Sequence, residues 1–191
     1  MSVFLRCRAF VFAVLAAFVP LSVCAADKTE LERQRQQFPL VYETALKGPV
    51  DTWRRLATGL ERYPLFPYLE LASLQRKTAT LKREDVDAFL KAWPDSLPAS
   101  MLRETFLFEL ARRQDWKNFA ALYDDATRNR ELRCDAQQAR LALGQKPDFA
   151  KDLQPLWLSD KPLPAACAAP MRWARDQGLL KPELIWQRID L

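Results

Sequence analysis

Apolar residues recur every three or four positions along nearly the whole chain, and this spacing constrains the fold more than any other feature of the sequence. It is the period of an amphipathic α-helix, whereas a half-buried strand alternates apolar and polar residues. Signals for strands are weak, since the 191 residues include only four glycines and no Asn-Gly or Asp-Gly turn. The sequence therefore predicts an all-α chain.

The clearest break between two predicted helices is the stretch from Tyr63 to Gln75, which contains Pro64 and Pro67. Pro64 disfavours helical backbone at the residue before it, while Pro67 suits the first turn of a new helix. A capping box, Thr29 to Glu32, predicts the start of the first helix. Similar signals predict helices over residues 29–46, 83–93 and 182–191, and helices that begin near Pro49 and Pro98.

Three Ala-Arg pairs, at residues 111–112, 139–140 and 174–175, form a loose internal repeat. Each pair closes a predicted helix before a short polar turn, as helix-pair repeats do. We therefore expect residues 27–191 to form one domain, a right-handed superhelix of short antiparallel helix pairs (a TPR-like α-solenoid fragment). A compact helical bundle is the alternative.

The first 26 residues have the pattern of a secretory signal peptide. Arg6 and Arg8 precede an unbroken run of eleven apolar residues, and small residues end at Ala26. This run is well short of the roughly 20 residues that a spanning helix needs, so no stable membrane span is expected. Cys24 lies in an approximate lipoprotein motif, which is the alternative to soluble export to the periplasm.

The charge balance argues against a nucleic-acid partner. Without Arg6 and Arg8, 27 basic residues remain against 24 acidic ones. The two signs alternate along the predicted helices instead of forming a basic patch, which is typical of a solvated surface.

Two cysteines, Cys134 and Cys167, remain after the leader, which contains Cys7 and Cys24. In an exported chain, two cysteines suggest one disulfide. A metal or redox pair is a poor alternative, because the chain has no histidine and two thiols cannot complete a tetrahedral zinc site.

Candidates for catalysis are few. The lack of histidine excludes Ser-His and Cys-His nucleophiles, and there is no Gly-rich phosphate loop. The adjacent carboxylates of Glu84-Asp85 and of Asp124-Asp125 suit a first helical turn or a loop, so we interpret both pairs as structural. We assign no catalytic, cofactor-binding or metal-binding residue, and we expect solvated faces for three helical glutamates: Glu104, Glu109 and Glu131.

The six tryptophans allow two interpretations, sugar stacking and core packing. Five of them lie beside aliphatic residues at helical spacing, which favours the core. Trp173, between two arginines, is not placed by this argument. The five expected in the core are Trp53, Trp93, Trp116, Trp157 and Trp186.

A series of motifs resembles the N-terminal, U-shaped superhelical region of soluble lytic murein transglycosylases, in the same order and at compatible spacing. The resemblance covers nearly all of the chain after the leader. The motifs are Tyr63-Pro-Leu-Phe-Pro-Tyr-Leu-Glu70, Glu109-Leu-Ala-Arg-Arg-Gln-Asp-Trp116, Cys134 with Gly144-Gln145, Leu156-Trp-Leu158, and Cys167.

This resemblance implies a periplasmic protein whose partner is peptidoglycan. The family cleaves the MurNAc-GlcNAc bond and forms a 1,6-anhydro product without a cofactor, using a lysozyme-like domain that follows the superhelix. It also places the family's disulfide on Cys134 and Cys167. The family's catalytic Glu-Ser and Gly-Leu-Met-Gln motifs are missing here, so no catalytic residue is carried over. We therefore expect a scaffold that is inactive alone, without the catalytic domain.

Two other functions remain open at this point. The first is a periplasmic helical-repeat adaptor that binds protein partners, including other cell-wall proteins. The second is an enzyme that uses the chain's own carboxylates. An apolar face on the last predicted helix, with Ile185, Trp186 and Ile189, needs a further helix to cover it and so favours a longer scaffold.

Overall fold

The computed structural model describes the backbone of residues 22–191 and the side chains of residues 28–191. Within this part the chain forms ten α-helices, two short 3₁₀ turns and one π-helical turn, with no strand. The α-helices are α1 (Ser22–Lys47), α2 (Val50–Leu56), α3 (Phe66–Gln75), α4 (Arg83–Ala92), α5 (Leu97–Arg113), α6 (Trp116–Leu122), α7 (Arg130–Ala142), α8 (Gln154–Trp157), α9 (Ala168–Asp176) and α10 (Pro182–Ile189). The 3₁₀ turns are η1 (Thr78–Thr80) and η3 (Ala165–Cys167), and the π-helical turn is η2 (Phe149–Leu153).

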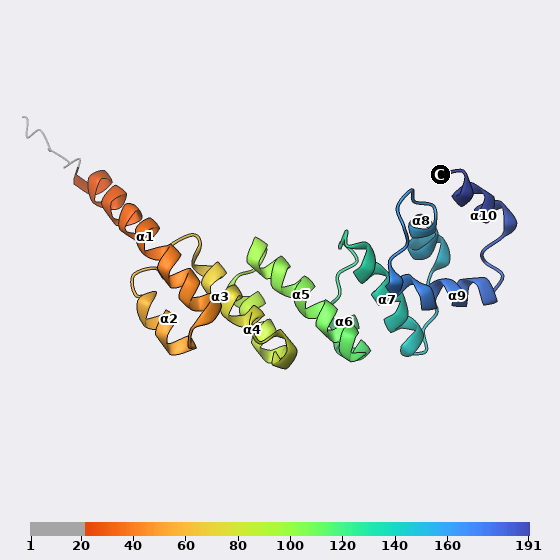
Figure 1. Cartoon of the computed structure of the whole chain (residues 1–191), viewed down its shortest axis with the longest axis horizontal. Helices are drawn as coiled ribbons and strands as arrows, with labels where there is room; N and C mark the ends of the chain where they lie inside the picture. Colours follow the sequence, from red (N-terminus) through yellow and green to blue (C-terminus); the bar gives the residue numbers. More distant parts are fainter. Residues whose placement is uncertain (1–21) are drawn as a thin grey trace, which may run out of the picture.

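The helices follow one another along an elongated molecule, with α1 at one end and α10 at the other (Figure 1). Each helix contacts its near neighbours in the chain: α1 packs on α2 and α3, α3 on α5, α5 on α6, and α6 on α7. A stack with only local contacts is the architecture of a helical superhelix. The predicted all-α superhelical fold is confirmed, and the compact bundle is wrong.

The core is divided along the stack into three clusters of buried side chains. The first joins α1, α2 and α3, the second runs from α3 to α7, and the third surrounds the segment from η2 to α9. Because each cluster lies between consecutive helices, no single central core is needed. Representative members are Trp53, Leu60 and Leu69 in the first, Leu102, Phe106 and Phe119 in the second, and Leu153, Leu156 and Met171 in the third.

Local sequence signals explain where the helices begin and end. Pro67 lies in the first turn of α3, as predicted, and the Ser96 hydroxyl caps α5 by accepting the backbone N–H of Ala99 at 3.2 Å. Gln114 ends α5 in the left-handed conformation, with φ 57°. The three Ala-Arg pairs lie at or within two residues of the ends of α5, α7 and α9, which confirms the predicted repeat of helix ends.

Two local predictions are wrong. The first helix begins at Ser22, so the capping box at Thr29 lies inside α1 and does not start it. Trp186, expected in the core, is 64% exposed, because no described element packs on that face of α10.

The predicted leader falls mostly outside the described residues. Residues 1–21 are not described, and Cys24 is described only as backbone in α1. Among the described helices, none is both long enough and apolar enough to cross a membrane.

Candidate functional site

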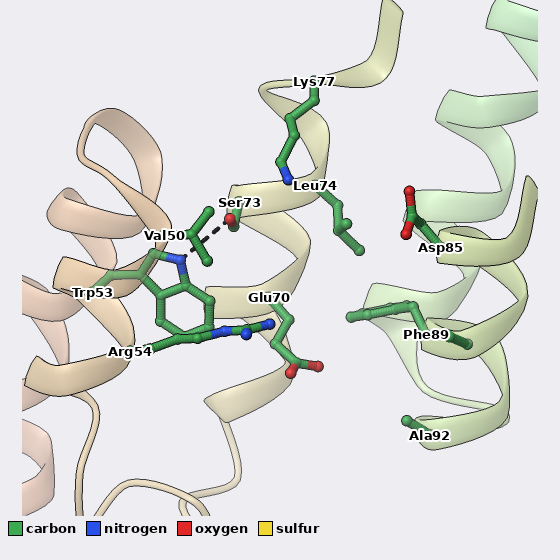
Figure 2. Close-up of a pocket in the computed structure, with 11 residues that line it drawn as sticks. Val50, Trp53, Arg54, Glu70, Ser73, Leu74, Lys77, Asp85, Phe89 and Ala92 are labelled. Atoms are coloured by element: carbon green, nitrogen blue, oxygen red, sulfur yellow. Dashed lines mark hydrogen bonds between the residues drawn. The ribbon is translucent and has the colours of Figure 1, made fainter. Parts of the chain in front are cut away.

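A cavity of about 270 Å³ lies between α2, α3 and α4 (Figure 2). Each of the three helices contributes one wall, and Lys77 contributes from the turn after α3. The lining combines apolar and charged side chains. Its residues are Val50, Trp53, Arg54, Glu70, Ser73, Leu74, Lys77, Asp85, Ala88, Phe89 and Ala92.

Trp53 forms the wall contributed by α2 and is held rigidly. Only 2% of it is exposed, and its indole Nε1–H donates to the Ser73 hydroxyl of α3 at 3.2 Å. The guanidinium of Arg54 lies 5.6 Å from the centroid of the Trp53 ring, within the range of a cation–π contact. The hydrogen bond between α2 and α3 fixes this side of the cavity (Figure 2).

Glu70 faces the cavity from α3 and is also held in place. Its Oε2 accepts a hydrogen bond of 2.7 Å from the indole Nε1–H of Trp93, at the end of α4. Trp93 packs in turn on Phe66, with 6.1 Å between the ring centroids. Asp85 enters from the exposed first turn of α4, where its carboxylate suits the helix dipole. Two basic and two acidic side chains thus share the lining.

This arrangement suits binding better than catalysis. Ser73 already accepts the Trp53 N–H, and among the described residues its hydroxyl donates no hydrogen bond to a general base. A glycosidic bond needs an acid whose pKa is raised in a cleft. Burial and the nearby Glu131 raise the pKa of Asp135 to about 6, but Asp135 does not line this cavity.

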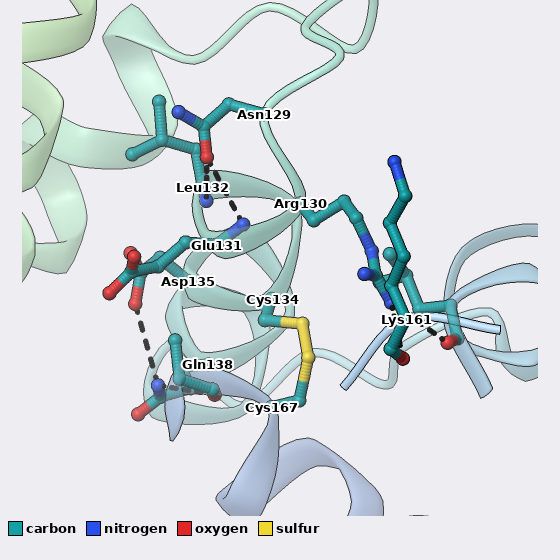
Figure 3. The surroundings of a disulfide bond; sticks show 11 residues. Asn129, Arg130, Glu131, Leu132, Cys134, Asp135, Gln138, Lys161 and Cys167 are labelled. Atoms are coloured by element: carbon teal, nitrogen blue, oxygen red, sulfur yellow. Dashed lines mark hydrogen bonds between the residues drawn. A yellow bond between two sulfur atoms is a disulfide. The ribbon is translucent and has the colours of Figure 1, made fainter. Parts of the chain in front are cut away.

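The structure places Cys134 in α7 and Cys167 in η3, and joins them in a disulfide (Figure 3). Their Cα atoms lie 4.8 Å apart, and both residues are buried in the third cluster. Gln138, one turn after Cys134, donates from Nε2 to the Ala166 carbonyl at 2.7 Å. Two links therefore tie α7 to η3, and they lie on one side of α7.

The three glutamates expected on solvated faces behave differently from one another. Glu104 and Glu131 are exposed, as predicted, but the prediction for Glu109 is wrong: it is only 8% exposed. Its carboxylate accepts hydrogen bonds of 2.6–2.7 Å from Arg112 and Arg113, which hold its pKa down at about 2. The (i, i+3) and (i, i+4) spacing of these arginines was a visible signal for the pairing.

No sequence pattern pointed to the cavity between α2, α3 and α4. Its lining comes from separate helices, and Arg54, Lys77 and Asp85 look in the sequence like ordinary members of solvated helix faces. Among the described residues there is also no group of three or more side chains that could hold a metal ion.

Comparison with known proteins identifies soluble lytic murein transglycosylases as relatives. No family model matches the chain. It is 30% identical to the soluble lytic murein transglycosylase of Salmonella typhimurium over 188 residues, which are 97% of this chain and 29% of that protein. It is also 30% identical to the protein of the same name from Escherichia coli K12 over 170 residues, which are 89% of this chain and 26% of that protein.

Solved structures show the same relationship. The crystal structure of the 70 kDa soluble lytic transglycosylase from Escherichia coli matches with a TM-score of 0.71 and 29% identity, over 83% of this chain and 26% of that chain. An inactive mutant of lytic transglycosylase Slt from Pseudomonas aeruginosa matches with a TM-score of 0.68 and 31% identity, over 80% of this chain and 25% of that chain. The chain therefore spans less than a third of the length of these relatives.

Proposed function

Because the chain is homologous to part of the soluble lytic murein transglycosylases along nearly its whole length, we propose that it is the superhelical scaffold of such an enzyme. The observation that carries the proposal is the structural match, in which sequence identity and fold agree over the same four-fifths of the chain. The scaffold presents a rigid stack of helices on which a catalytic domain and the glycan are positioned.

The proposed enzyme cleaves the MurNAc-GlcNAc bond of peptidoglycan and forms a 1,6-anhydro product. In this proposal the chain itself does not carry the chemistry, because the family's Glu-Ser and Gly-Leu-Met-Gln motifs are missing from it. Residues 1–26 act as the signal peptide, residues 27–191 form the superhelical domain, and the protein works in the periplasm. The Cys134–Cys167 disulfide fits that oxidising compartment.

Incubation of the purified mature chain with intact sacculi tests the proposal. We expect weak retention that falls as salt is raised, since a mildly basic surface faces stem peptides that carry carboxylates. We expect no release of anhydro-muropeptides. Release of such products contradicts the scaffold assignment, and so does retention no greater than that of an unrelated helical protein of equal charge.

The exposed apolar face of α10, which a following helix of a longer scaffold would cover, is also compatible with a second candidate function. Trp186 and Ile189 are each 64% exposed, and Ile185 is 42% exposed. Such a patch is typical of a contact with another protein surface, as in a periplasmic adaptor. Photo-crosslinking from position 186 in periplasmic extract separates the two functions: capture of a specific protein without retention on sacculi favours the adaptor.

A further inference from the structure

A second cavity, of about 310 Å³, lies at the other half of the stack. Its walls are the loop between α6 and α7, one side of α7, and the π-helical turn η2. It shares no residue with the cavity between α2, α3 and α4. The residues that line it are Tyr123, Asp125, Thr127, Arg128, Arg133, Gln137, Lys151 and Asp152.

One buried acceptor atom at this cavity has no partner, and a second has only an ion pair. Gln137 is only 3% exposed, and its buried Oε1 accepts no hydrogen bond. The buried Oδ2 of Asp152 accepts no well-oriented hydrogen bond, but it forms an ion pair of 3.4 Å with the Arg140 guanidinium. Buried polar atoms are nearly always satisfied, and leaving one unpaired is costly. Gln137 Oε1 therefore calls for a donor that the described chain does not supply.

The same cavity holds cationic groups that lack a carboxylate partner. Within residues 28–191, neither Arg128 nor Arg133 forms an ion pair, whereas Lys151 lies 3.5 Å from Asp125. Tyr123 adds a neutral donor, because burial and the nearby Asp125 raise the pKa of its hydroxyl to about 12. A carboxylate is the natural partner of free guanidinium groups, which bind it with paired N–H donors.

The buried acceptors and the unpaired cationic groups are both held by packed helices and turns. Arg133 and Gln137 are four residues apart and share one side of α7. The neighbouring side, with Cys134 and Gln138, is tied to η3 by the disulfide and a hydrogen bond (Figure 3). Lys151 and Asp152 come from η2, and π-helical turns occur often at functional positions.

We propose that this cavity binds a short zwitterionic peptide, with its ammonium N–H donors toward Gln137 and the Asp152 carboxylate and its own carboxylate toward Arg128 and Arg133. A simple anion such as phosphate fits less well, because the Asp125 and Asp152 carboxylates repel it. A simple cation also fits less well, because Arg128 and Arg133 repel it. That the peptide is a murein stem rests on the proposed function, but the binding of a zwitterion does not.

Calorimetric titration of the mature chain with alanyl-alanine tests the inference. N-acetylated alanyl-alanine, which lacks the ammonium, and alanyl-alanine amide, which lacks the carboxylate, serve as matched ligands, and inorganic phosphate is a third. We expect saturable binding of the free dipeptide and at least about tenfold weaker binding of each comparison ligand, since each loses one charge-assisted set of hydrogen bonds. Equal binding of all four, or no saturable binding, overturns the proposal.

Variants locate the binding. We expect Gln137→Leu, which keeps the side-chain size, and Arg128→Gln, at an exposed position, each to weaken dipeptide binding at least about tenfold. The controls are Gln177→Leu and Arg172→Gln, exposed residues that do not line the cavity. Should Gln137→Leu lose helicity, Arg128→Gln alone decides. Unchanged affinity in Arg128→Gln overturns the assignment, and dipeptide binding without retention on sacculi contradicts the proposed function only.

Discussion

Replacing both Cys134 and Cys167 by alanine should lower the free energy of unfolding by about 3.5–4 kcal/mol, because the crosslink restricts the unfolded chain. The two cysteines are 33 positions apart, and the loop-closure entropy of a loop that long corresponds to this magnitude. Both side chains are also buried in the third cluster, beside Leu156 and Met171. We therefore expect the loss to fall on the segment from α7 to α9, while the first cluster keeps its packing.

Urea denaturation followed by circular dichroism measures this loss in the oxidised protein and in the double-alanine variant. A reducing agent should destabilise the oxidised protein by a similar amount and leave the variant unchanged, which separates the crosslink from altered packing. Thiol titration of the denatured, unreduced mature protein should find no free thiol. Two free thiols, or equal stabilities with and without reductant, would refute the reasoning.

Other substitutions test individual contacts. Glu109→Gln should lower the free energy of unfolding by about 1.5–3 kcal/mol at pH 7, because it weakens charged hydrogen bonds, while Glu104→Gln on the same helix should change it by less than about 0.5 kcal/mol. Because the pKa of Glu109 is lowered to about 2, its contribution to the free energy of unfolding is complete above pH 4.5 and is lost as the pH falls toward 2. In urea titrations, the difference in stability between the native protein and Glu109→Gln should therefore be smaller at pH 2.5 than at pH 7. Asp135 should behave in the opposite sense: its raised pKa of about 6 costs stability as the pH rises from about 4 to 6, so Asp135→Asn should gain stability relative to the native protein over that interval in the same assay. Trp53→Phe should lose about 1–3 kcal/mol by thermal or urea unfolding, because the buried Ser73 hydroxyl loses its donor.

The fold could be predicted from the sequence because the signals that start and end its helices are local. Pro67 at the start of α3, Ser96 at the cap of α5 and the Ala-Arg helix ends each act within a few residues of themselves. A stack in which each helix contacts its near neighbours needs few distant contacts, so correct helices nearly determine its architecture. The start of α1 was missed because the residues before Thr29 also continue the helix, and a capping motif does not by itself end a preceding helical turn.

The candidate sites could not be predicted from the sequence, because they depend on contacts between residues that are distant in the chain. The cavity between α2, α3 and α4 depends on Trp93 reaching Glu70 across 23 positions, and on Trp53 reaching Ser73 across 20. The second cavity depends on the burial of Gln137, which occurs because η2 packs next to α7. Nothing in a single sequence distinguishes a glutamine that will be buried without a partner from one that faces water, since both occur at the same helical spacing. Burial of Gln137 depends on the distance between α7 and η2. In a helical stack that distance is set by the turns and by the disulfide at Cys134, which holds the neighbouring side of α7. The disulfide therefore has two expected effects, on the stability of the third cluster and on the shape of the second cavity. Reduction should weaken dipeptide binding even under conditions where the helices remain folded.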